Sequence, residues 1–479
     1  MTANLPVAVI GAGSVGLAAA AHLAERRRPF VVLEAGVGPG HSVRQWGHVR
    51  LFSPWRYNTD PAARRLLDDT GWNAPDPDEL PTGAQLVDQY LQPLADSPAI
   101  APHLRYRSRV TAISRLDTDR MRTAARDQAP FVIRLANGDE ITAAAVIDAS
   151  GTWTNPNVLG ANGLPAHGEP EAAAWIDHAL PDVFGAGRSR YAGKHTVIVG
   201  AGHSAATTLL ALAELAEQEP GTRLTWAIRA DAPDRAYGGG DDDALPARGS
   251  LGSGLRLLVD KGVVELAAGF KTRALRTLPG GAGVELIARR EDGSEWAIAA
   301  DNIVAATGYR PDHSIAGELR LDLDPILGTT RLLAPLIDPN DHSCGTVRPH
   351  GVDELAHPEP GYYAIGMKSY GRAPTFLLAT GYEQARSVVA ALAGDWEAAR
   401  DVQLDLPETG VCSVTLAVRA IAADFGLAPD IPAQLLAATS RHLPQHINPA
   451  DAVLAAAAEL GIDPAAAFKL AALAGESSG

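Results

Sequence analysis

Apolar and polar positions near the amino terminus alternate in blocks that are typical of an α/β protein. Short apolar runs at residues 7–10 and 30–34 flank a glycine-containing turn and an alanine-rich stretch that extends to Arg28. A short apolar run bounded by glycine is typical of a buried strand, and the longer stretch is typical of a helix. The order strand, turn, helix, strand predicts a βαβ unit.

The turn in this unit carries three glycines at the spacing that a dinucleotide requires. Gly11 permits the tight turn, Gly13 lets the backbone approach a pyrophosphate, and Gly16 lets the helix pack closely on the strand. The helix that follows this turn points its positive dipole end at the phosphates. Glu34 ends the second strand, where a carboxylate can accept hydrogen bonds from a ribose hydroxyl. A merely structural turn is the alternative, because glycine turns before helices are common in α/β proteins.

The same pattern recurs in the middle of the chain, where an apolar run at residues 196–199 precedes a second small-residue turn, a helix and a further strand. The residues of this turn that we assign to nucleotide binding are Gly200, Gly202, His203, Ser204 and Ala205. Arg229 ends the strand that follows, at the place of the carboxylate in the first unit. A guanidinium matches a 2′-phosphate, so we expect NADPH over NADH, with a solvated strand-end arginine as the alternative. Two such units predict two bound nucleotides, unless one is a duplicated copy without a ligand.

Composition and charge limit the classes of partner. Of the 479 residues, 46% are apolar, so each of two or three domains can bury a core. The formal net charge of −15 disfavours nucleic acid and membrane surfaces as partners. The two cysteines, Cys344 and Cys412, lie far apart without a CxxC pair, which indicates a reducing cytoplasm. We find no signal-peptide pattern before the first strand, and the apolar runs are shorter than the roughly 20 residues that span a bilayer.

Over residues 7–394 the chain resembles the two-dinucleotide-domain flavoproteins, which include flavin-containing monooxygenases and pyridine-nucleotide disulfide oxidoreductases. In that superfamily a small-residue turn ends each nucleotide-binding half, and here Gly151 follows one apolar run while Thr307 and Gly308 follow another. The resemblance implies an α/β fold with two Rossmann-like three-layer domains, an FAD domain with an inserted NADPH domain, plus a C-terminal helical extension. The implied bounds are residues 1–155 for the first part of the FAD domain, 190–310 for the NADPH domain, 311–400 for the second FAD part and 410–479 for the extension.

In relatives, a strand and the helix after it face the flavin, and the matching segments here are residues 362–367 and 375–392. The resemblance assigns Gly366 and Thr375 to cofactor binding, with the helix dipole stabilising negative charge on the flavin and Pro374 in the first turn of the helix. Many disulfide reductases have an aspartate directly after this glycine, whereas Met367 and Lys368 follow it here. Lys368 either holds the flavin's negative charge or is simply solvated.

Residues 44–58 are rich in flat side chains, and in similar proteins this region lies along the flavin and the substrate pocket. We expect Trp46 and Trp55 to pack on the cofactor, and the alternative is a surface loop with a tryptophan beneath it. The candidates for catalysis are Ser53, Asn58, Cys344 and Lys368, and Val110 completes the cofactor-binding set. Cys344 is either a reactive thiol beside the flavin or a small buried residue. No metal is expected, because the sequence around Cys344 offers no fourth zinc ligand at close spacing.

Two further segments carry weaker signals. Residues 235–249 predict an irregular loop, either over the nicotinamide or inert on the surface, and Arg248 in it could assist a phosphate. Beyond residue 410 an alanine-rich pattern predicts helices at residues 433–439, 450–460 and 464–473. This extension fits a dimerisation element of a homodimer, a lid or a solvated stabilising tail.

The second half-reaction separates the functions. A disulfide reductase needs two neighbouring thiols, which the sequence lacks, whereas a monooxygenase needs none. The turn with Ser204 before Ala205 resembles the second glycine motif of flavin-containing monooxygenases. We therefore expect an FAD-dependent, NADPH-consuming monooxygenase acting on a small heteroatom-containing substrate. An NADPH-dependent reductase or oxidase, and a non-catalytic redox sensor, are the alternatives.

Overall fold

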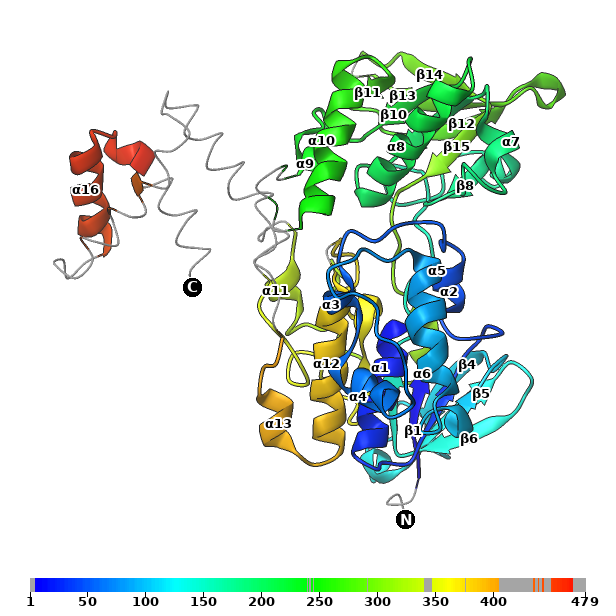
Figure 1. Ribbon diagram of the computed structural model, residues 1–479, viewed down its shortest axis with the longest axis vertical. Helices are drawn as coiled ribbons and strands as arrows, with labels where there is room; N and C mark the ends of the chain where they lie inside the picture. Colours follow the sequence, from blue (N-terminus) through cyan, green and yellow to red (C-terminus); the bar gives the residue numbers. More distant parts are fainter. Residues whose placement is uncertain are drawn as a thin grey trace.

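The computed structural model describes residues 5–238, 240, 243, 245–290, 292–339, 347–374 and 376–404, and residues 434–435, 438, 442 and 449–467 of the C-terminal part. Three residues named above, Cys344, Thr375 and Cys412, lie outside these ranges. Two five-stranded sheets of parallel strands form two units, one above the other in Figure 1. The predicted fold class is confirmed.

The first unit has three layers built around the strand order β16-β7-β1-β2-β3. Its strands are β1 (Val7–Ile10), β2 (Phe30–Leu33), β3 (Leu104–Arg105), β7 (Ala145–Asp148) and β16 (Tyr362–Ala364). On one face α1 (Ser14–Glu25) packs against α12 (Leu378–Leu392), and the run of alanines in α1 lets the two helices approach closely. The other face is covered by an antiparallel meander of β4 (Val110–Arg115), β5 (Phe131–Leu135) and β6 (Glu140–Ala143).

Shorter helices complete this unit. They are α2 (His41–Arg44), α3 (Trp55–Asn58), α4 (Pro61–Asp68), α5 (Gly83–Leu86), α6 (Gln92–Asp96), α11 (Ala334–Ile337) and α13 (Trp396–Arg400). The alanine-rich helix predicted after the glycine turn, up to Arg28, begins earlier, at Ser14 within the turn, and ends at Glu25. Helix α12 begins at Leu378 and not at residue 375, so Pro374 precedes the helix and does not lie in its first turn. The predicted strand at residues 362–367 ends at Ala364, because Gly366 takes a positive φ of 71° and starts a 3₁₀ helix, Gly366–Tyr370.

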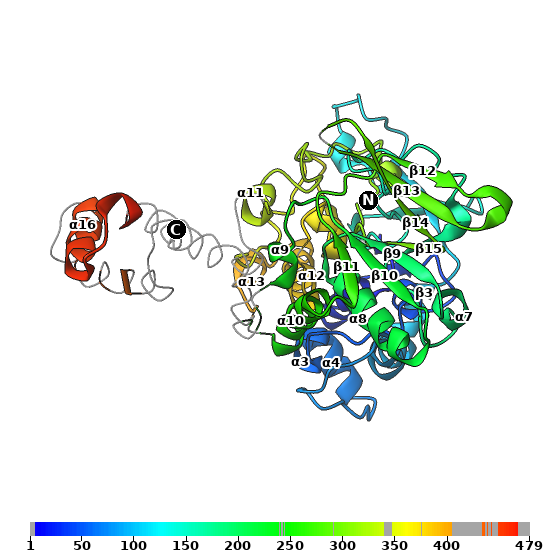
Figure 2. The ribbon, with the colours of Figure 1, turned by 90° about the horizontal axis from the view of Figure 1, so that it is seen from above.

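The second unit repeats the plan with the strand order β11-β10-β9-β15-β8. Its strands are β8 (Ile176–His178), β9 (His195–Val199), β10 (Arg223–Ala227), β11 (Val264–Ala267) and β15 (Asn302–Ala305). Figure 2 shows a meander of β12 (Ala274–Thr277), β13 (Val284–Arg289) and β14 (Glu295–Ala300) on one side of this sheet and α8 (His203–Gln218) with α10 (Pro246–Asp260) on the other. Two short helices, α7 (Arg188–Tyr191) and α9 (Asp234–Tyr237), complete the unit.

Two details of this unit differ from the sequence prediction. The sheet includes β8, which lies before residue 190, the predicted start of this unit. This edge strand has only three residues, two of them polar, so it lacks the apolar run from which a strand can be predicted. The predicted irregular loop at residues 235–249 holds part of α9 and the start of α10. Within it Arg248 is buried and forms a two-pronged ion pair with Asp243, both N–O distances being 2.7 Å, so its charge is engaged by a carboxylate and not by a phosphate.

The two units are joined by two connections that lie side by side. Asn157 Nδ2 donates to the Thr307 carbonyl oxygen at 2.9 Å, and Thr307 Oγ1 donates to the Asn157 carbonyl oxygen at 2.8 Å. Pro156 and Tyr309 form an antiparallel bridge, and the Arg310 amide donates to the Asn155 carbonyl oxygen at 3.1 Å. The second unit is therefore an insertion whose two ends meet.

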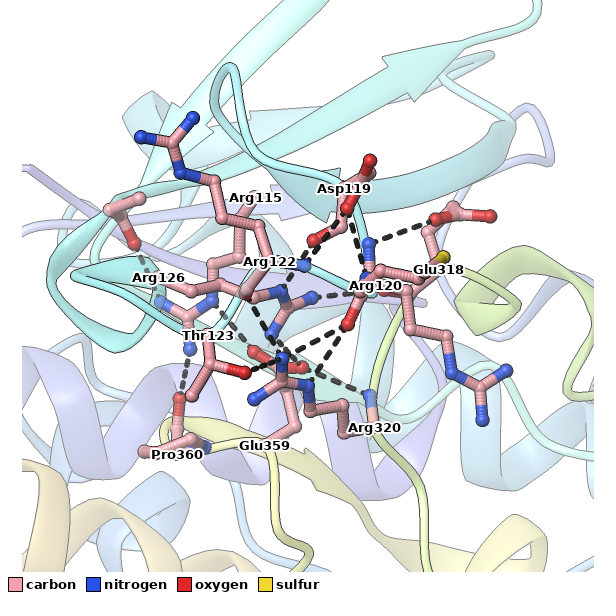
Figure 3. Close-up of polar contacts among 12 residues, drawn as sticks. Arg115, Asp119, Arg120, Arg122, Thr123, Arg126, Glu318, Arg320, Glu359 and Pro360 are labelled. Carbon is pink, nitrogen blue, oxygen red and sulfur yellow. Dashed lines mark hydrogen bonds and ion pairs between the residues drawn. The ribbon is translucent and has the colours of Figure 1, made fainter.

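A buried ion-pair cluster secures the meander of the first unit (Figure 3). Glu359 accepts from Arg115 Nε at 2.7 Å, from Arg126 Nη1 at 2.5 Å and from the Arg320 amide at 3.0 Å. Arg126 also donates to the carbonyl oxygens of Asp119 and Glu318, at 3.1 and 3.0 Å. Burial alone would raise the pKa of Glu359, but these donors hold it below its ordinary value. The cluster thus fixes the loop between β4 and β5 to two distant segments.

The described part of the C-terminal extension contains α16 (Pro449–Leu460), at the place of the predicted helix at residues 450–460. Its apolar residues form a separate small core with members drawn from residues 435–467. Of the helices in the described ranges, none combines the length and the apolar character that crossing a bilayer requires.

Candidate functional site

A cavity of about 630 Å³ lies between the two units and is lined by residues of both. From the first unit it takes in the turn before α1, and from the second unit it takes in the start of α8. Predicted site residues that line the cavity are Gly11, Gly13, Ser14, Glu34, Trp46, Val110, Gly151, His203, Ser204, Gly366 and Lys368. The structure therefore gathers positions that are far apart in the sequence into one space.

The first glycine turn has the free space that a pyrophosphate would need. A Cβ atom added at Gly11 would lie 2.7 Å from the Ala149 carbonyl oxygen, and one added at Gly16 would lie 2.0 Å from the Gly11 carbonyl oxygen. A Cβ atom added at Gly13 would meet no heavy atom within 4 Å, and Gly13 lines the cavity. No side chain fits at Gly11 or Gly16, where the backbone packs closely. At Gly13 the backbone faces open space in the cavity, as FAD binding at this turn requires.

Glu34 is held in place by the backbone around it. Its Oε2 accepts from the Ala12 amide at 2.7 Å and its Oε1 accepts from the Gly36 amide at 2.6 Å. The side chain is buried yet borders the cavity, and each carboxylate oxygen keeps a second lone pair. This arrangement fits a ribose hydroxyl that donates from the cavity side.

The second glycine turn repeats these features. A Cβ atom added at Gly200 would lie 2.1 Å from the Ala306 carbonyl oxygen, whereas one at Gly202 would meet no heavy atom within 4 Å. Ala205 is fully buried in the helix, where a small side chain is needed, and does not border the cavity. His203 and Ser204 open α8 on the cavity wall, so the residues present fit a second pyrophosphate at this helix start.

His203 carries the contact between the two units at this wall. Its ring lies 5.2 Å from the ring of Phe52, which comes from the first unit. Burial lowers the pKa of His203, and the nearby charge of Arg248 lowers it further. Both effects favour the neutral form of the imidazole beside the cavity.

Arg229 lies beyond the end of β10, as predicted, but it is exposed and does not border the cavity. Its Nη1 donates to the Ala161 carbonyl oxygen at 3.4 Å. Thr307 and Gly308 likewise lie off the cavity, in the connection between the units. These positions can contact a nucleotide only at the part that extends out of the cavity.

The structure corrects the interpretation of residues 53–58. Trp55 is 3% exposed and belongs to the core of the first unit, so it cannot pack on a cofactor in the cavity. Ser53 Oγ donates to Asn58 Oδ1 at 3.0 Å, and Asn58 Nδ2 donates to the carbonyl oxygens of Ser53 and Pro54 at 2.6 and 3.0 Å. Ser53 and Asn58 therefore stabilise the turn into α3, and neither borders the cavity. Only Trp46 of the two tryptophans does.

Two aromatic residues that the sequence analysis did not single out line the cavity. Trp153 and Tyr309 stack with ring centroids 4.9 Å apart, and Trp46 lies 6.5 Å from Trp153. Trp153 Nε1 also donates to Gln45 Oε1 at 2.8 Å. Each residue follows one of the two small-residue turns, and that position was the signal that could have identified them.

Lys368 is fully buried and not solvated. Its Nζ donates to Asp148 Oδ2 at 2.6 Å and to Ser150 Oγ at 3.0 Å. Tyr362 also donates to Asp148 Oδ2, at 3.0 Å. Burial by itself would raise the pKa of Asp148, but the charge and hydrogen bond of Lys368 outweigh it and lower that pKa. The position after Gly366, where many disulfide reductases carry an aspartate, holds Met367 in this chain. The carboxylate near this glycine is that of Asp148 at the end of β7, which forms an ion pair with Lys368.

One cavity borders the first glycine turn and the start of α8, the helix that follows the second glycine turn, and this arrangement is typical of an oxidoreductase that holds two nucleotides. The chain belongs to the pyridine nucleotide-disulphide oxidoreductase family, whose profile matches residues 8–343. Members bind FAD and a pyridine nucleotide. No curated protein gives a significant match.

Solved structures with the same fold include both reductases and monooxygenases. A bacillithiol disulfide reductase from Bacillus cereus is 17% identical with a TM-score of 0.59, and the match covers 81% of this chain and 99% of that one. A cadaverine monooxygenase of desferrioxamine biosynthesis from Erwinia amylovora, solved with FAD, is 16% identical with a TM-score of 0.58, covering 84% and 97%. A variant of a flavin monooxygenase from Stenotrophomonas maltophilia is 21% identical with a TM-score of 0.51, covering 81% and 98%. At these identities the likeness concerns the fold.

Proposed function

We propose that the protein takes hydride from NADPH onto FAD and passes the electrons to oxygen, as a monooxygenase of a small heteroatom-containing substrate. The observation that carries this proposal is the single cavity that borders both Gly13 and Ser204. Two nucleotides held at these two helix starts would share one space, as hydride transfer between them requires.

The chain's own residues supply binding and shelter. Gly13 and Glu34 would hold the pyrophosphate and ribose of FAD, and His203 with Ser204 would hold those of NADPH. The stacked rings of Trp153 and Tyr309 cover one part of the wall and limit the entry of water. Bound FAD supplies the chemistry, since it accepts two electrons as hydride and passes them to a second acceptor.

Transfer to oxygen is favoured over transfer to a disulfide by the residues around the cavity. None of the described lining residues is a cysteine, and the sequence offers no pair of neighbouring thiols. A reductase of the bacillithiol disulfide type, or an oxidase that releases peroxide, is the second candidate because the fold is shared with such a reductase. The net charge of −15 disfavours nucleic acid and membrane surfaces, so the proposed partner is a small molecule. The two cysteines are too few for a disulfide framework, so the proposed compartment is a reducing cytoplasm. A homodimer through the C-terminal extension remains part of the proposal.

Purified protein with FAD tests the reaction. Without oxygen, one equivalent of NADPH should bleach the flavin absorbance. With oxygen and an amine or thioether as the substrate, each NADPH should yield one oxygenated product according to NADPH + H⁺ + O₂ + substrate → NADP⁺ + oxygenated substrate + H₂O. The amount of oxygenated product per NADPH measures this balance. Full recovery of the electrons as hydrogen peroxide with every substrate would favour the oxidase, and turnover only with a disulfide would favour the reductase. Failure to bind FAD would reject the whole proposal.

The choice of NADPH over NADH depends on Arg229. Replacing Arg229 with alanine should raise the KM for NADPH by about 10-fold or more, in the range of a lost charge-assisted contact to phosphate, and change the KM for NADH by less than about twofold. Arg223→Ala, an exposed arginine at the opposite end of β10, is the matched control and should leave both constants unchanged. Equal effects of Arg229→Ala on the two cofactors would contradict the assignment.

A further inference from the structure

Lys368 is not an isolated basic group, because it forms a buried ion pair with Asp148. Both side chains are almost inaccessible, with relative exposures of 1% and 0%. Taking two charges out of water is costly unless further hydrogen bonds support them, so such a pair is not an incidental surface contact. The pair joins the end of β7 to the 3₁₀ helix Gly366–Tyr370, and the cavity is bordered by this 3₁₀ helix and by the residues directly after β7.

Every acceptor around the ammonium can be counted. A lysine ammonium carries three N–H donors, and Asp148 and Ser150 take two of them. Ser150 is exposed on the cavity wall, and Lys368 itself borders the cavity. Within the part of the chain that the structure describes, no acceptor takes the third N–H.

Asp148 is itself held from three sides. Its Oδ2 accepts from Lys368 Nζ and from the Tyr362 hydroxyl, and its Oδ1 accepts from the Ser150 amide at 3.1 Å. A carboxylate with these donors stays ionised and cannot rotate freely. It fixes the lysine side chain and offsets a large part of its positive charge.

We propose that Lys368 donates its remaining N–H to the flavin ring and that Asp148 is the positioning residue that orients Lys368 and moderates its charge. This inference rests on the proposed function, since it takes FAD as the occupant of the cavity. The positive member stabilises negative charge on the ring, and the negative member limits that effect. The two residues should therefore act on the flavin in opposite directions.

Sulfite binding measures this effect without turnover. Sulfite adds to oxidised flavin and leaves a negative charge on the ring, so its dissociation constant reports the charge around the ring, and the absorbance change gives it directly. Lys368→Met should weaken sulfite binding to the FAD-loaded protein by about 10-fold, and Asp148→Asn should tighten it by a similar factor, as expected for one charge at partly screened distance. The double variant Lys368→Met with Asp148→Asn should fall between the two single variants.

The control separates this effect from general loss of stability. Glu359→Gln breaks a comparable buried ion pair in the cluster of Figure 3, away from the cavity, and should leave sulfite binding within about twofold of the starting protein while lowering the melting temperature. Lys368→Arg keeps the charge and should also stay within about threefold, which provides a second test if Lys368→Met does not fold.

Several outcomes would overturn the inference. If both single variants weaken sulfite binding alike, the pair has only a structural role. The same conclusion follows if Lys368→Met leaves the constant within about twofold of the starting protein, because one removed charge should move it further. A protein that binds FAD and is reduced by NADPH but ignores these substitutions would reject this inference alone, whereas a protein that does not bind FAD would reject the proposed function.

Discussion

Gly13 and Gly16 lie in the same turn, but an added methyl group meets different surroundings at each. At Gly16 it would lie 2.0 Å from a carbonyl oxygen, and at Gly13 it would meet no heavy atom within 4 Å. Gly16→Ala should therefore destabilise the FAD-free protein by about 1–3 kcal/mol through overpacking. Gly13→Ala should leave that stability unchanged and weaken FAD binding by about 10-fold, because the methyl group takes the space of the pyrophosphate.

Thermal unfolding without FAD and fluorescence titration with FAD check the two effects separately. Gly202→Ala is the counterpart in the second unit, where the added methyl group also meets open space. This variant should retain FAD and lose affinity for NADPH. Normal FAD affinity in Gly13→Ala would show that the turn does not hold a pyrophosphate.

His357 gives the protein a pH dependence of stability. Burial, with a smaller contribution from the neighbouring His313, lowers its pKa from the ordinary 6.5 to about 4. The unfolded chain then binds a proton more readily than the folded chain. The stabilisation is complete above pH 6.5 and is lost as the pH falls from 6.5 toward 4. At about 1.4 kcal/mol per pH unit, His357 accounts for up to about 3 kcal/mol.

Urea unfolding between pH 7 and pH 4 checks this effect. His357→Gln should flatten the fall in unfolding free energy over that interval. Part of the slope should remain, because burial lowers the pKa of His313 and His350 as well. The exposed His48 is the matched control, and His48→Gln should leave the slope as it is. An unchanged slope in His357→Gln would contradict the assignment.

Among the elements, the stacked aromatic residues of the two connections have the clearest consequence. Tyr309 packs on Trp153 and both border the cavity. Tyr309→Ala should open the wall to water, so that a larger fraction of the electrons from NADPH appears as hydrogen peroxide. Tyr309→Phe keeps the ring and should match the starting protein. The ratio of peroxide to oxygenated product measures the effect, and equal ratios in both variants would exclude the sheltering role.

The elements that the sequence revealed are those whose pattern is local. The apolar runs of β1 and β9, each followed by a glycine turn, predicted both βαβ units, because a buried parallel strand requires such a run. The start of α12 and the edge strand β8 were missed, since their bounds depend on neighbouring segments and not on their own residues. The tertiary environment overrides local preference at these places.

At the scale of the whole molecule, the fold could be predicted and the cavity only in part. The repeated glycine turns imply two units, and the same local patterns indicate Gly13, Glu34 and Ser204, all of which border the cavity. Trp55, only nine residues after Trp46, turned inward to the core, and no periodicity distinguishes the two. Long-range partners decide such cases, as with the acceptor that Asp148 provides for Lys368.

The adjoining ends of the second unit have a consequence for how such proteins can be altered. Because Asn157 and Thr307 are hydrogen-bonded neighbours, the intervening segment leaves and re-enters the first unit at one point. A short peptide spanning these two positions could replace the whole segment without stretching the rest of the chain. Related chains could exchange this block, and with it their electron donor, while the partner half kept its own shape.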